Sequence, residues 1–193
     1  SGENAIDSLL SGVRWGSGSG TVQLTYSFGT SSSVYVSGYS EPTNGFAELS
    51  DSQKTAVRSA LEYWSNVANI TFTEVTDSST VAGDLRFAKS NDPSTAWAYY
   101  PSTGTKGGDV WVGPSANYNN MAEGTYGFQT MLHEIGHALG LSHTHDGTQA
   151  ASSIDWTGYS VMSYKSYEGA ATSGYTQGYY PTTPMINDIK AIQ

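Results

Sequence analysis

H-E-I-G-H-A-L-G-L-S-H, residues 133–143, is the stretch that decides most about this 193-residue chain. On an α-helix a four-residue step turns about 400° and rises about 6 Å, so His133 and His137 share one face and can bind the same metal ion. Gly140 can adopt a left-handed conformation that ends the helix. The chain then turns, and His143 can approach the ion from outside the helix. The stretch therefore predicts a metal site of three histidines.

The predicted ligand set is that of a catalytic zinc rather than a structural one. Three imidazoles leave a fourth position for water, whereas a structural zinc is normally closed by a fourth protein ligand, usually cysteine, and the chain has none. Glu134 lies about 100° round the helix from His133, offset from the ligand direction but within reach of the water. We expect one zinc ion, with Glu134 as general base, and hydrolysis of an amide without a covalent intermediate.

The fourth histidine of the chain has a different expected role. His145 follows the third predicted ligand by two residues. We expect it to be a solvent-exposed neighbour rather than a ligand. With one spare imidazole and no thiols, a second zinc site built on His or Cys is not expected.

Outward from this motif, the sequence alternates between helical and extended patterns. The motif lies in a predicted helix over residues 125–139, and an amphipathic helix over 51–69 begins with Ser50 and Gln53 in capping-box spacing. A short helix is expected at 5–10, and Thr183 and Pro184 are expected to open a last helix that runs to 192. Short β-favouring segments predict strands over 21–28, 70–75, 83–88, 96–100 and 109–112, with a weaker strand signal at Val34 and Val36.

Composition excludes several classes of partner. Only 8 Lys and Arg stand against 17 Asp and Glu, which gives a net charge of −9 and no basic surface for nucleic acid or anionic membranes. The absence of cysteine excludes disulfides and thiol catalysis. No apolar run approaches the roughly 20 residues that a membrane span needs. We expect no nucleic acid and no membrane among the partners, and a monomer by default.

A second motif lies downstream of the histidines. S-V-M-S-Y, residues 160–164, together with the extended histidine motif, resembles the metzincin metallopeptidases and closely resembles the Met-turn of the serralysin family. The resemblance implies that Met162 forms a hydrophobic floor beneath the metal. It also implies that Tyr164 is an additional zinc ligand that can swing away and help to stabilise the oxyanion.

The similarity to serralysins extends over nearly the whole chain, through residues 61–74, 107–111, 130–143 and 183–193. It implies an α+β, metzincin-like catalytic domain over residues 1–193, with an upper lobe of about 1–140 and a lower lobe of about 141–193. The implied fold has a mixed five-stranded twisted sheet, two long helices, and an irregular C-terminal lobe that ends in a helix. Residues Trp97, Ala98 and Tyr99 fall at the edge strand above the cleft, where an extended polypeptide substrate can pair through its backbone.

Two departures from the serralysin pattern affect what can be carried over. The calcium-binding G-G-x-G-x-D-x-U-x repeats do not occur in this chain, so secretion to the extracellular space is implied by the relatives alone. The acidic balance would accommodate a calcium ion, but no ligand spacing specifies one. Thr144 and His145 stand where these relatives commonly carry Pro and Gly, so we expect a different loop beside His143. A proteinaceous inhibitor is a further candidate partner.

Two alternatives to a zinc endopeptidase stay open on the sequence. The first is a catalytically weak binding module that keeps the fold and holds protein or glycan with the tyrosines of its irregular half, Tyr159, Tyr164, Tyr167, Tyr175, Tyr179 and Tyr180. The retained Glu134 argues against it. The second is a zinc hydrolase that acts on a non-peptide amide, which differs only in the cleft.

Overall fold

The computed structural model describes residues 1–172 and 178–193, so Tyr175 lies outside the described residues. A sheet of five strands forms the upper part, in the order β2-β1-β3-β5-β4. The strands are β1 (Val22–Phe28), β2 (Ile70–Glu74), β3 (Leu85–Lys89), β4 (Ala96–Ala98) and β5 (Asp109–Val112). All neighbouring pairs are parallel except β4 and β5, which are antiparallel. This confirms the predicted α+β fold with a mixed five-stranded sheet and places β4 at one edge.

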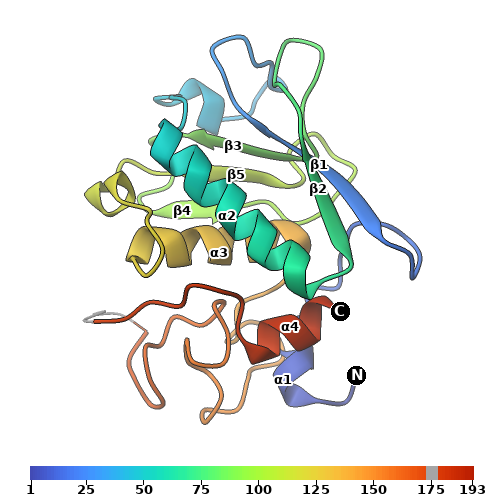
Figure 1. Ribbon diagram of the computed structural model, residues 1–193, viewed down its shortest axis with the longest axis vertical. Coiled ribbons are helices and arrows are strands. Elements are labelled where there is room, and N and C mark those ends of the chain that lie inside the picture. The colour runs from blue at the N-terminus through green and yellow to red at the C-terminus, as the bar shows by residue number, and fades with distance from the viewer. Residues whose placement is uncertain (173–177) are drawn as a thin grey trace.

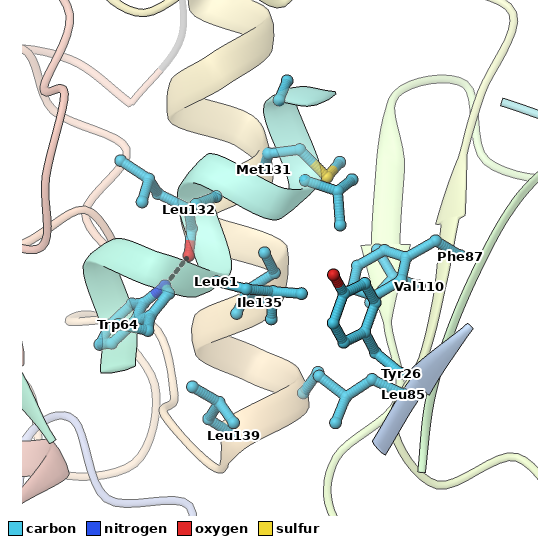
Figure 2. Packing of buried hydrophobic residues seen from close by; sticks show 14 of the residues in the cluster. Tyr26, Leu61, Trp64, Leu85, Phe87, Val110, Met131, Leu132, Ile135 and Leu139 are labelled. Carbon is cyan, nitrogen blue, oxygen red and sulfur yellow. Dashed lines mark hydrogen bonds between the residues drawn. The ribbon is translucent and has the colours of Figure 1, made fainter. Parts of the chain in front are cut away.

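Two long helices cover one face of this sheet, as Figure 1 shows: α2 (Asp51–Val67) and α3 (Tyr126–Leu139). The predicted capping box of α2 is present, because the Gln53 amide donates to the Ser50 hydroxyl and the Ser50 amide donates to the Gln53 side chain. The apolar faces of both helices meet the inward side chains of β1 and β3 in one core, part of which is drawn in Figure 2. Trp64 of α2 is fully buried there, and its indole donates to the Leu132 carbonyl of α3 at 3.2 Å. The two helices are thus fixed against each other by packing and by a buried hydrogen bond.

Two short helices and the irregular C-terminal segment lie on the other side of α3 from the sheet. Helices α1 (Asn4–Asp7) and α4 (Ile186–Ile192) contact each other, and the segment between α3 and α4 has little regular structure in its described part. Two 3-10 turns, η1 (Glu41–Thr43) and η2 (Ala116–Asn119), complete the described elements. None of the described helices combines the length and the apolar composition that a bilayer crossing requires.

Several predicted boundaries were wrong. The helix expected at 5–10 ends at Asp7, because the next residues pair with the turn after α3: the Ser142 amide donates to the Leu9 carbonyl at 2.8 Å, and Leu10 bridges Leu141. Val34 and Val36 lie in no strand, and both are exposed. The helix expected at 51–69 ends two residues earlier.

The start of the last helix was also placed wrongly. Helix α4 begins at Ile186 with Met185 as its N-cap, not with Thr183 and Pro184. The reason is a carboxylate inside the first turn: Asp188 accepts a hydrogen bond from the Met185 amide at 2.7 Å. The same carboxylate accepts bonds from the Ser160 hydroxyl and the Val161 amide, so the helix start is set by a contact with the segment that precedes Met162.

Candidate metal centre

Helix α3 has sharply defined ends, and both follow from single residues. The Thr125 hydroxyl caps the start by accepting from the Phe128 amide at 3.3 Å. Gly140 ends the helix at φ 110°, in the left-handed region, and the Leu141 amide donates back to the Gly136 carbonyl at 2.9 Å. A side chain at position 140 would collide with the Val13 carbonyl oxygen. The predicted helix, its glycine stop and the turn towards His143 are therefore all present.

The three predicted ligand histidines converge. One ring nitrogen from each of His133, His137 and His143 lies within 4.8 Å of those of the other two, and the Nε2 atoms of His137 and His143 are 3.0 Å apart. His133 and His137 are each 7% exposed. Zinc bound tetrahedrally at 2.0–2.1 Å from each nitrogen needs separations of about this size.

The other nitrogen of each ring, Nδ1, lies within hydrogen-bond distance of an oxygen atom of the protein. His133 Nδ1 lies 2.8 Å from the Val161 carbonyl oxygen, and His137 Nδ1 lies 2.7 Å from the Leu141 carbonyl oxygen. His143 Nδ1 lies 2.8 Å from a carboxylate oxygen of Asp146. Each contact requires a proton on Nδ1 and so leaves Nε2 as the lone-pair nitrogen. Hydrogen bonds within the protein thus orient all three rings for metal binding before any metal is bound.

Electrostatics favours neutral, metal-ready imidazoles. Burial lowers the pKa of His133 well below its ordinary value and lowers the pKa of His137 to about 3, with the neighbouring histidines adding to both effects. Burial also lowers the pKa of His143, although Asp146 opposes that effect. Because a histidine must lose its proton to ligate a metal, these rings bind a cation without first releasing protons at neutral pH.

Glu134 lies beside the histidines as a buried carboxyl group without a partner. It is 5% exposed, and its Oε2 makes no hydrogen bond. Burial raises the pKa of Glu134 to about 8. A carboxylate buried without compensation is costly, and a nearby cation would remove much of that cost. Three neutral imidazoles therefore form a donor set that fits a divalent metal such as zinc, and the unpartnered carboxyl group of Glu134 lies beside it.

Met162 occupies the position expected of a floor residue. It is fully buried, and a Cβ atom added to Gly136 would lie 2.6 Å from its sulfur. Gly136 stands between the two histidines of α3, so its missing side chain is what lets the sulfur approach the helix directly under the ligands. The role of Met162 beneath a bound metal stays a prediction.

Tyr164, from the irregular segment after α3, also lies next to the ligand histidines. Its hydroxyl lies 2.8 Å from His143 Nε2, and its ring stacks on His133 with centroids 5.5 Å apart. Burial raises its pKa to about 12, with Glu134 adding to the effect. The hydroxyl is thus a neutral donor next to the ligand nitrogens.

The expected exposure of His145 was wrong. Its ring lies nearly parallel to that of His143, with centroids 5.0 Å apart, and contacts Tyr164 at 4.9 Å. Its Nδ1 is buried. Since His145 occurs where glycine was expected from relatives, this packing is a local feature of the loop. Spacing from the motif could not reveal it, because the loop folds back over the third ligand.

A pocket opens beside His133 and Glu134. It has a volume of about 270 Å³, and its wall includes Tyr118, Tyr126, Gln129 and Thr130. Ala96 of β4 and the preceding Thr95 line it, whereas the predicted substrate-binding residues 97–99 do not.

The side chains of Trp97 and Tyr99 lie towards Glu41 instead. The Trp97 indole donates to the Glu41 carboxylate at 3.2 Å, and the Tyr99 hydroxyl donates to the same oxygen. The backbone of β4 lies at the free edge of the sheet, whereas these two side chains are directed to Glu41. Ala98 is partly buried against the core.

The sequence did not predict the supporting carboxylates around the site. Asp146 holds His143, while Asp155 and Asp188 accept hydrogen bonds from residues next to the histidine turn and the Met-turn. The one available signal was the acidic residue three positions after the third ligand. Asp155 and Asp188 carry no comparable signal, because their partners near the site, Thr144, Ser160 and Ser163, lie 8 to 28 positions away.

Comparisons with known proteins agree with this geometry. The Matrixin family matches residues 41–154. The chain is 35% identical to "Serralysin" of Photorhabdus sp. (strain Az29), over 99% of this chain and 43% of that protein. It is 37% identical to "Metallopeptidase AprA" of Pseudomonas marginalis, over 91% and 40%, and 36% identical to "Serralysin A" of Dickeya chrysanthemi, over 77% and 34%. The chain thus spans between about a third and about two fifths of the length of these relatives.

Proposed function

The chain belongs to the Matrixin family of peptidases, and from that premise we propose that it is a secreted, zinc-dependent endopeptidase that hydrolyses peptide bonds of proteins. The similarity to serralysins confirms the resemblance predicted from the two motifs. The observation that carries the proposal is the convergence of three neutral imidazoles on one point beside a buried, unpartnered Glu134.

His133, His137 and His143 would hold the zinc ion, with Tyr164 as a further ligand. When bound, zinc would polarise the scissile carbonyl and lower the pKa of a water molecule. Both groups of three close His, Asp or Glu ligand atoms found among the described residues include histidine, and calcium is not part of the proposal.

Glu134 would move the proton. Its carboxylate would accept a proton from the attacking water and pass it to the nitrogen of the leaving amine. The cation would lower the pKa of Glu134 from the value of about 8 that burial gives it, and so put the base into its working form at neutral pH.

The substrate would be an extended polypeptide. The free edge of β4 offers backbone donors and acceptors that pair with a strand of any sequence. The Tyr164 hydroxyl, neutral because its pKa is raised to about 12, would move from His143 towards the carbonyl oxygen and donate to the developing oxyanion. Residues 1–193 would act as one catalytic unit and as a monomer, with the cleft between the lobe up to about residue 140 and the lobe after it. An inhibitor protein would bind in the same cleft.

The test is hydrolysis of casein and of a quenched-fluorescence peptide library by the zinc-loaded protein, compared with its Glu134→Ala variant, with zinc content measured in both. The parent is expected to cleave, and the variant to bind zinc and lose activity by at least about 10²-fold. Retention of zinc with no cleavage by the parent would overturn the proposal. Hydrolysis of small amides but not of peptides would favour a non-peptide amide hydrolase, and binding of protein or glycan without any hydrolysis would favour the binding module.

A further inference from the structure

Asp155 lies in the irregular segment between His143 and the Met-turn, and both oxygens of its carboxylate accept hydrogen bonds. One oxygen accepts hydrogen bonds from the Thr144 hydroxyl and from the Ser163 hydroxyl, the latter at 2.7 Å. The other oxygen accepts from the Lys165 ammonium group at 2.7 Å. Asp155 is 4% exposed, so these bonds replace water almost completely.

The two hydroxyl partners are neighbours of the two groups that meet at the metal centre. Thr144 directly follows the third ligand, His143, and Ser163 directly precedes Tyr164. Thr144 and Ser163 are each 1% exposed, so water cannot replace Asp155 as the hydrogen-bond acceptor of either hydroxyl. One carboxylate oxygen therefore bonds to both chain segments that carry the side chains of His143 and Tyr164. The side chains themselves meet where the Tyr164 hydroxyl lies 2.8 Å from His143 Nε2.

The surroundings of Asp155 favour its ionised, carboxylate form. Burial raises the pKa of the carboxyl group, but the hydrogen bonds from Lys165, Thr144 and Ser163 outweigh it and lower the pKa below its ordinary value. A carboxylate is a stronger acceptor than a carbonyl group, so the two hydroxyls are held by charge-assisted bonds.

A purely structural ion pair would look similar at first sight. Asp77, 3% exposed, pairs with Arg86 at 3.0 Å and accepts from the hydroxyls of Ser27 and Ser33. Its partners belong to β1, to β3 and to the loop after β1, and none adjoins a residue of the metal centre in sequence. Asp77 is therefore a matched control: it has the same chemistry and similar burial, at a different place in the fold.

We propose that Asp155 is a positioning residue that fixes His143 and Tyr164 relative to each other through Thr144 and Ser163. The inference rests on the proposed function only in taking these two side chains as zinc ligands. Loss of the acceptor removes one hydrogen bond from each of the two buried hydroxyls, so both ligand-bearing segments relax away from the common geometry. The expected result is weaker zinc binding and slower turnover, because supporting residues of this kind typically contribute 10- to 100-fold to metal affinity or activity.

The first experiment measures zinc affinity by competition with a chromophoric chelator, which needs no substrate. Asp155→Ala is expected to weaken zinc binding 10- to 100-fold. Asp155→Asn keeps a carbonyl oxygen for the two hydroxyls and is expected to stay within about threefold of the parent protein. Asp77→Ala is expected to lower the unfolding temperature but not the zinc affinity. Equal loss of affinity in the Asn and Ala variants, or in Asp77→Ala, would overturn the proposal.

Milder variants keep the test decisive if Asp155→Ala does not fold. Thr144→Val and Ser163→Ala each remove one hydroxyl and leave the carboxylate paired with Lys165. Each is expected to weaken zinc binding by about 3- to 10-fold, with far-UV circular dichroism unchanged. Unchanged affinity in both variants would contradict the proposal.

A double-mutant cycle then separates the two functional readouts. In Tyr164→Phe protein, Thr144→Val and Ser163→Ala are expected to lower kcat less than they do in the parent, because part of their effect passes through the missing hydroxyl. Fully additive losses would show that Asp155 does not act through Tyr164. If the parent hydrolyses no peptide while the zinc affinities follow the expected order, the proposed function fails and the positioning role stands.

Discussion

Substitution of Gly140 by alanine tests how the third ligand is placed. The residue has φ 110°, and an added Cβ would meet the Val13 carbonyl oxygen, which is backbone and cannot rotate away. The conformation alone costs an L-residue about 1–2 kcal/mol. The Gly140 carbonyl also accepts hydrogen bonds from the Ser11 hydroxyl at 2.6 Å and from the Ser11 amide at 3.3 Å, and displacement of the loop would weaken both, at about 1 kcal/mol each.

The expected destabilisation of Gly140→Ala is therefore about 3–4 kcal/mol. For a chain of this size, that corresponds to a fall of roughly 6–16 °C in unfolding temperature. The matched control is Gly124→Ala, since Gly124 has φ 80° but no atom within 4 Å of the added Cβ. The control should show only the conformational cost of about 1–2 kcal/mol. Chemical denaturation of the metal-free proteins measures both free energies of unfolding.

The same pair of variants connects stability with the site. Because Gly140 directs the chain from α3 to His143, Gly140→Ala should also weaken zinc binding, whereas Gly124→Ala should leave it unchanged. Equal destabilisation by the two substitutions would show that the approach to Val13 is relaxed at no cost. Unchanged zinc affinity in Gly140→Ala would refute the view that this glycine sets the position of the third ligand.

Three further predictions concern charge and metal. Asp146→Ala removes the acceptor at His143 Nδ1, 2.8 Å away, and is expected to weaken zinc binding about 10-fold by chelator competition; Asp146→Asn should retain most of the affinity. Removal of zinc by a chelator, from a concentration about 100 times its Kd, is expected to lower the free energy of unfolding by roughly 3 kcal/mol in calorimetry, and no change would show that the folded state holds no zinc. Burial raises the pKa of Asp109 to about 7, so the folded protein binds a proton that the unfolded chain, with a pKa near 4, releases. This group should therefore lower the free energy of unfolding between about pH 4 and pH 7, by on the order of 4 kcal/mol, and Asp109→Asn should make the slope in urea titrations at several pH values shallower by that amount.

The parts of the fold that followed from the sequence are those with a local cause. The helix over residues 125–139 was predicted to within a residue, because the threonine cap and the glycine stop both lie next to it in the chain. The capping box of α2 and the strand over 109–112 were predicted for the same reason. The three histidines and Glu134 share one short segment, so their geometry is that of a helix and one turn.

The parts that the sequence could not supply depend on contacts between distant segments. Helix α1 is shorter than predicted because its continuation pairs with residues more than 120 positions away. Residues 97–99 form part of the expected strand, but the direction of the Trp97 and Tyr99 side chains is set by Glu41, which no periodicity connects to them. The packing of His145 over His143 depends on a loop conformation that only the structure reveals.

The two halves of the metal centre are held by different forces, and this decides how each can fail. The ligands on α3 stand on a helix whose residues from Gly127 onward are all buried, so apolar packing fixes them. The opposite half is irregular, and its placement depends on buried carboxylates: Asp188 holds the segment before Met162 to α4, and Asp155 holds Thr144 to Ser163. Hydrogen bonds of this kind are specific in geometry but leave unsatisfied buried groups when one partner is lost. Substitutions in the core should therefore lower stability while the ligand geometry persists in the folded fraction, whereas substitutions of these carboxylates should disturb His143 and Tyr164 in molecules that remain folded.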